Sequence, residues 1–204
     1  MIRLIKYNQA ENLINEGDIL LFRGRLYYCI FPNIAWIVAK IGGGIHTHSG
    51  MASWSGKILE CLEFRELKGG RAVNLKHQVD LFPGRIDVFR VKSPSCYFDL
   101  EYNKITIEYN PYIITEKFRE LTGHPYSHIS ILEILFHSLF AKHDFLNKNL
   151  EQNNFNKFVC STVIAELFKQ NYVNLYPLKK TKYISPSNLA HSAMLQYLFT
   201  LDKN

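Results

Sequence analysis

Hydrophobic and polar residues alternate in short runs over the first half of the chain, a period typical of β-strands. Gly56 and Lys57 suit the tip of a hairpin between two of these runs. The segment 69–84 reads as a loop that contains one short strand. The predicted strands cover 15–24, 46–55, 56–64 and 84–92.

The apolar period lengthens in the second half of the chain and becomes typical of amphipathic helices. Thr115 is a candidate N-cap for the first helix, and Ser185 followed by Pro186 suits the start of the last. The predicted helices cover 115–125, 129–142, 157–172 and 184–199. Since strands come first, helices follow and no linker or repeat separates them, the chain is predicted to be one α+β domain over residues 1–204.

The most apolar run, residues 27–41, is interrupted by Pro32 and Asn33 and is shorter than the ~20 residues that span a bilayer. It is expected to be a core helix, and a helix lying on a membrane surface is the alternative. The N-terminus has no signal-peptide pattern, so a cytoplasmic location is expected. The four cysteines have wide, irregular spacings, which favours reduced thiols over a disulfide framework.

The formal net charge of +6 is spread evenly along the 204 residues. A nucleic-acid-binding surface needs clustered basic residues, and the only basic block is LKKTK at 178–182. No nucleic-acid partner is therefore expected.

Cys160 lies at the start of a predicted helix, after an Asn-rich polar segment. The amide groups at a helix N-terminus favour a nearby anion and so lower the pKa of a thiol. A cysteine in this position is a candidate nucleophile, but it needs a base from elsewhere in the fold.

His46 and His48 are two positions apart, so they share one face of a regular strand. Glu60 is predicted to lie across the hairpin from His48, close enough to orient its imidazole. Glu63 is three residues further along and should point to the opposite face, so Glu60 is the predicted partner. Cysteine, histidine and carboxylate together would form a nucleophilic triad.

Other interpretations of the same residues stay open at this point. A free cysteine is usually a buried core residue, and a single histidine is usually packed and satisfied by the main chain. His46 and His48, with Cys160 or Glu60, could also hold a zinc ion. No phosphate-binding glycine motif is present at Gly42–Gly44.

The motifs GDILLF, THSGM, ILE, GHPYS, FVCSTVIAELF and ISPSNLA follow one another from residue 16 to about residue 192. This order resembles the circularly permuted branch of the NlpC-type papain-fold hydrolases, more narrowly the bacterial YiiX-like group, and more distantly the lecithin–retinol acyltransferase-like proteins. The permuted branch has histidine, acid and cysteine in the order found here. The resemblance implies an antiparallel, barrel-like sheet packed against helices, with Cys160 as nucleophile, His48 as base and Glu60 as the orienting acid.

The resemblance also implies a thiol hydrolase that acts on a peptide or peptidoglycan-type amide through a thioester, with no cofactor and no metal. Tyr126 is expected by analogy to contact the substrate. One alternative is acyl transfer or ester hydrolysis on lipids by the same three residues, with 27–41 and 129–142 as the acyl-accepting surface. Another is a non-catalytic binding protein that retains the fold. The oligomeric state is not predicted.

Overall fold

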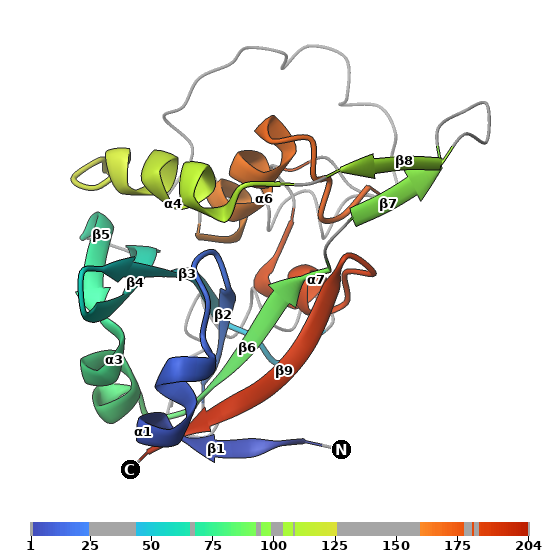
Figure 1. Cartoon of the computed structure of the whole chain (residues 1–204). Coiled ribbons are helices and arrows are strands. Elements are labelled where there is room, and N and C mark those ends of the chain that lie inside the picture. Colours follow the sequence, from blue (N-terminus) through green and yellow to red (C-terminus); the bar gives the residue numbers. More distant parts are fainter. Residues whose placement is uncertain are drawn as a thin grey trace, which may run out of the picture.

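A computed structural model describes residues 2–24, 44–65, 68–92, 95–98, 104–107, 109–125, 160–177, 181 and 184–203. The predicted helix 129–142, the apolar run 27–41 and Tyr126 lie outside these residues. The described part of the chain is a mixed α+β structure built on a seven-stranded sheet, so the predicted α+β class is confirmed (Figure 1).

The sheet has the strand order β1-β9-β6-β2-β3-β4-β5. Its strands are β1 (Leu4–Lys6), β2 (Ile19–Arg23), β3 (His48–Ser55), β4 (Ile58–Arg65), β5 (Gly69–Asn74), β6 (Arg85–Val91) and β9 (Leu195–Asp202). β1 runs parallel to β9, and the other neighbouring strands of this sheet are antiparallel. A separate antiparallel pair consists of β7 (Ser95–Phe98) and β8 (Lys104–Ile107).

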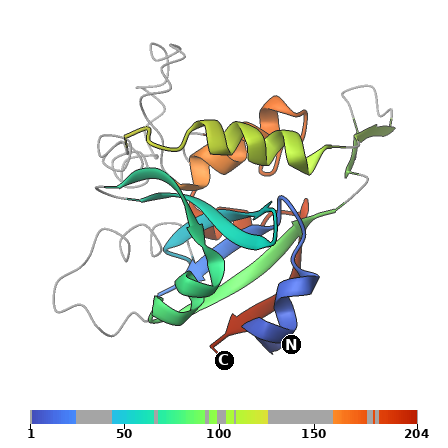
Figure 2. The same cartoon turned by 60° about the vertical axis from the view of Figure 1, so that its left-hand side comes forward.

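Hydrophobic cores cover both faces of the sheet, because apolar residues occupy consecutive positions of its central strands. Along β2, Ile19 and Leu21 belong to one core and Leu20 and Phe22 to the other. The first core includes α4 (Pro111–Glu120), α6 (Cys160–Gln170) and α7 (Pro186–Ala190), and the second includes α1 (Tyr7–Ala10) and α3 (Leu75–Leu81). A short 3-10 turn, η1 (Glu11–Leu13), follows α1. Figures 1 and 2 show α4 and α6 together on one side of the sheet, with α1 and α3 toward the other. No described helix is both long and apolar enough to cross a bilayer.

The first predicted helix begins earlier than the sequence indicated. Asn110 is its N-cap, because the Asn110 side chain accepts a hydrogen bond from the Tyr112 main-chain N–H at 3.0 Å, and Pro111 occupies the first turn. The Thr115 hydroxyl instead donates to the Pro111 carbonyl at 3.2 Å, inside the helix. The prediction of Thr115 as N-cap is therefore wrong.

The chain between 69 and 84 and the C-terminal segment also differ from the prediction. The predicted short strand is β5, but the rest of that segment holds α3, which Asn74 caps. Ser185 caps α7 as predicted, and the helix ends at Ala190 instead of extending to 199. Residues 195–202 form β9 instead, because Phe199 and Leu201 fill the core beneath the sheet while the main chain pairs with β6.

Candidate active site

The hairpin of β3 and β4 fixes which side chains surround His48. Ser55 pairs with Ile58, so Gly56 and Lys57 form the predicted two-residue tip, and Gly56 has the positive φ of 61° that such tips require. The same register places Gly50 opposite Glu63. Glu63 is therefore the diagonal neighbour of His48 on the same face of the sheet.

The prediction that Glu60 lies beside His48 is wrong. Glu60 is opposite Ser53, on the other face of the sheet, and its Oε2 accepts a hydrogen bond from Arg119 Nη1 at 2.7 Å. A pair between 48 and 60 would need a hairpin centred on Trp54, whereas the hairpin turns between Gly56 and Lys57.

Glu63 is completely buried, and both of its carboxylate oxygens are hydrogen-bonded. Its Oε2 lies 2.7 Å from Nε2 of His48, and its Oε1 accepts hydrogen bonds from Arg71 Nε at 2.8 Å, from Arg71 Nη2 and from Gln78 Nε2 at 2.7 Å. Arg65 Nε lies 3.6 Å from the same Oε1. Burial alone would raise the pKa of Glu63, but the hydrogen bond with His48 and the surrounding cations lower it to about 2. Glu63 is therefore a carboxylate at neutral pH.

The His48 side chain is 14% exposed, and its ring lies 5.0 Å from the ring of Phe22. Burial lowers the pKa of His48, but the charge and hydrogen bond of Cys160 and those of Glu63 outweigh burial and raise it to about 9. Because Nε2 is bonded to Glu63, Nδ1 is the nitrogen left to face the sulfur. Glu63 thus fixes the ring orientation and favours the imidazolium form.

Cys160 is the first residue of α6 and is 5% exposed, and α6 packs against β3. Burial raises the pKa of its thiol, but the charge and hydrogen bond of His48, together with hydrogen bonds from the side chain and main chain of Ser49, lower it overall. The structure therefore brings the predicted Cys160 and His48 together and favours a thiolate–imidazolium pair. Cys61, by contrast, is buried, and burial raises the pKa of its thiol well above the ordinary value, which disfavours the thiolate.

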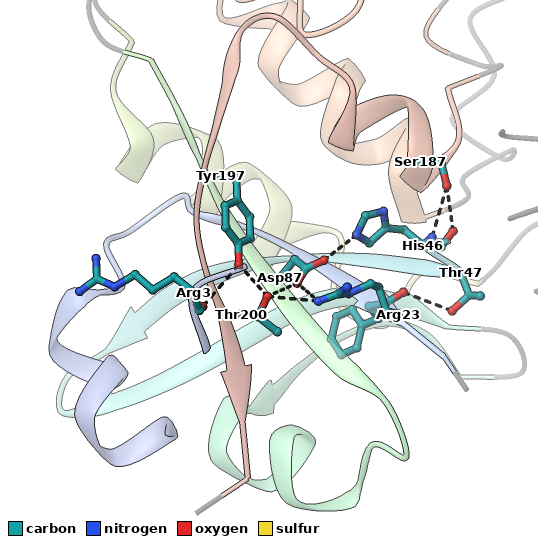
Figure 3. Close-up of polar contacts among 9 residues, drawn as sticks. Arg3, Arg23, His46, Thr47, Asp87, Ser187, Tyr197 and Thr200 are labelled. Atoms are coloured by element: carbon teal, nitrogen blue, oxygen red, sulfur yellow. Dashed lines mark hydrogen bonds and ion pairs between the residues drawn. The ribbon is translucent and has the colours of Figure 1, made fainter. Parts of the chain in front are cut away.

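His46, which precedes β3, belongs to a separate polar network (Figure 3). Its Nε2 lies 2.8 Å from Oδ2 of Asp87, whose Oδ1 accepts hydrogen bonds from Arg23 Nη2 at 2.8 Å and from the Thr200 hydroxyl at 2.5 Å. The Ser187 hydroxyl contacts the main-chain N and O of His46 at 3.3 and 3.4 Å. The network fixes the chain just before β3 and leaves His46 apart from Cys160. His46 and His48 bind different carboxylates and so do not form the zinc site considered above.

Sequence reasoning missed Glu63 and Asp87 as partners of the histidines. The usable signal was a carboxylate inside an apolar strand, since Glu63 is flanked by Leu62 and Phe64 and Asp87 by Ile86 and Val88. Such a charge is rarely buried without a partner. Among the described residues, no group of three or more His, Cys, Asp or Glu side chains is placed to hold a metal ion.

No protein-family model matches the chain, and no curated protein matches it in sequence. Among solved structures, the fold is similar to that of the metalloprotein yiiX from Escherichia coli O157:H7, with a TM-score of 0.56 and 14% sequence identity. The match covers 90% of this chain and 96% of that chain. An identity this low carries information about the fold alone. The chain is therefore similar in fold to yiiX, in agreement with the predicted resemblance to the YiiX-like group.

Proposed function

We propose that this chain is a cysteine hydrolase in which Cys160 is the nucleophile, His48 the general acid and base, and Glu63 the carboxylate that orients His48. The observation that carries the proposal is the continuous contact from the buried sulfur through the imidazole to a carboxylate. A purely structural cysteine does not need a neighbour that lowers its pKa.

The reaction follows from the charge states of the three groups. The Cys160 thiolate attacks the carbonyl carbon of the substrate, and the oxyanion collapses to a thioester as His48 protonates the leaving amine. His48 then removes a proton from water, which attacks the thioester and releases the acid. The main-chain N–H of Cys160, at the start of α6, would donate to the oxyanion.

The chemical class of substrate in this proposal is a peptide or peptidoglycan-type amide, following the resemblance to permuted NlpC-type hydrolases. In the same proposal, residues 1–204 are one domain of permuted papain-like architecture. The lipid alternative depends on 27–41 and 129–142, which lie outside the described residues. The structural neighbour yiiX is called a metalloprotein. Among the described residues of this chain, no group of three or more His, Cys, Asp or Glu side chains fits a metal ion, and the proposed reaction uses none.

The proposal is tested by labelling with a thiol-reactive acyl probe, located on the protein by peptide mass spectrometry. Wild-type protein should be labelled at Cys160, and Cys160→Ser should not. Glu63→Gln should label at least about tenfold more slowly, because the neutral amide no longer orients His48 or favours its imidazolium form. Glu60→Gln is the matched control, since Glu60 is bonded to Arg119, and it should label like wild type. Equal labelling of wild type, His48→Ala and Glu63→Gln would contradict the proposal.

A further inference from the structure

The Ser49 hydroxyl has an unusual environment for a buried serine. Ser49 is 0% exposed, and its Oγ has no hydrogen-bond partner among the described residues. A buried hydroxyl without a partner is costly and needs a physical explanation. The other buried serines in the described part of the chain each hydrogen-bond to nitrogen or oxygen; these are Ser53, Ser161, Ser185, Ser187 and Ser192.

The position of Ser49 on β3 directs its side chain toward Cys160. Successive residues of a strand point to opposite faces, so Ser49 shares its face with Met51 and not with His48. Met51 and Cys160 belong to the same hydrophobic core. The Ser49 side chain helps to lower the pKa of the buried Cys160 thiol in this core.

The main-chain N–H of Ser49 is also directed away from β2. The Ala52 N–H donates to the Asp18 carbonyl, on the β2 side, at 2.8 Å, so the N–H groups of odd-numbered residues of β3 point toward β4. The pairing of β3 with β4 ends at Gly50 and Glu63, one residue before Ser49. The Ser49 N–H therefore lies beyond the strand ladder, where it interacts with the Cys160 sulfur.

We infer that Ser49 stabilises the thiolate of Cys160, with both the Ser49 hydroxyl and the Ser49 main-chain N–H donating to the sulfur. The thiolate is then held by the His48 imidazolium on one side and by Ser49 on the other. A neutral thiol is only a weak hydrogen-bond acceptor and a thiolate is a stronger one, so the Ser49 hydroxyl favours the charged sulfur. Ser49 transfers no proton in the reaction, and its effect is on the population and position of the nucleophile. This inference rests on the proposed role of Cys160 as nucleophile.

The test is the rate of Cys160 alkylation by iodoacetamide as a function of pH, read by peptide mass spectrometry so that the other cysteines do not interfere. Ser49→Ala and Ser49→Gly both remove the hydroxyl and keep the N–H, so one can substitute for the other if either fails to fold by circular dichroism. Both should shift the profile to higher pH and slow alkylation at pH 6 by roughly threefold to tenfold, where tenfold corresponds to one pKa unit. Ser49→Thr keeps the hydroxyl and should restore the wild-type profile.

Ser53→Ala is the matched control, because Ser53 is a buried serine on the same face of β3 whose hydroxyl donates to Glu16 at 2.8 Å. Its alkylation profile should equal that of wild type. A folded Ser49→Ala or Ser49→Gly protein with the wild-type profile would overturn the role of Ser49 and leave the hydrolase proposal standing. A wild-type profile typical of an ordinary thiol would overturn both.

Discussion

At the scale of single residues, Glu63 links the proposed chemistry to the stability of the fold. It is a fully buried carboxylate that is hydrogen-bonded to His48 through one oxygen and to Arg71 and Gln78 through the other. Sequence reasoning proposed Cys160 and His48 from a helix start and a strand position, and the structure places the two residues together. That reasoning selected Glu60 over Glu63 even though the predicted tip at Gly56 and Lys57 is correct. With that tip Gly50 faces Glu63, and pairing His48 with Glu60 shifts the register enough to exchange the two faces.

The pKa of Glu63 predicts how stability depends on pH. Its pKa falls from 4.5 to about 2 in the folded protein, so the ionised carboxylate stabilises the fold above pH 4.5. This stabilisation should be lost as the pH falls from about 4.5 toward 2, because protons then bind the unfolded chain first. Urea unfolding across this window should show a smaller loss for Glu63→Gln than for wild type, together with lower stability at pH 7. Glu60→Gln should keep the wild-type slope, and an identical slope in Glu63→Gln would contradict the assignment.

At the scale of elements, the sequence pattern identified the strands of the β2–β3–β4–β6 core well, since their apolar residues alternate or run continuously between clear turns. It failed for β9, which follows closely after α7 in the sequence. This segment contains Leu, Gln, Tyr and Phe, which occur in both helices and strands. The strand is selected by tertiary pairing with β6 and β1, which no local pattern contains. The helix α3 was missed because its seven residues give too short a period to detect.

Asp87 ties several of these elements together, because its carboxylate binds Arg23 of β2, Thr200 of β9 and His46 before β3. Asp87→Asn should lower the free energy of unfolding by roughly 3 kcal/mol, since it leaves the Arg23 charge without its buried partner. Asp80→Asn, on the exposed side of α3, is the matched control and should change stability by less than about 0.5 kcal/mol. Chemical denaturation of both variants measures this difference, and equal stabilities would show that the network does not hold the strands.

At the scale of the whole molecule, the sheet and the late helix α6 matter to the proposal because they bring together residues that are far apart in the sequence. His48 and Glu63 come from one early hairpin, whereas Cys160 comes from a helix packed on the same strand. The α+β class followed from the order of strands and helices, and the similarity to yiiX agrees with it. The meeting of α6 with β3 could be predicted only through the family resemblance, because long-range packing leaves no periodic mark in a sequence.

The most direct test of the proposed triad is a crystal structure of the protein after reaction with a covalent thiol inhibitor. The inhibitor should be bonded to the sulfur of Cys160. Nδ1 of His48 should lie within hydrogen-bonding distance of the sulfur or the inhibitor, and Nε2 of His48 should be hydrogen-bonded to Glu63. An inhibitor attached to another cysteine, or a His48 ring separated from Cys160 by intervening side chains, would contradict it.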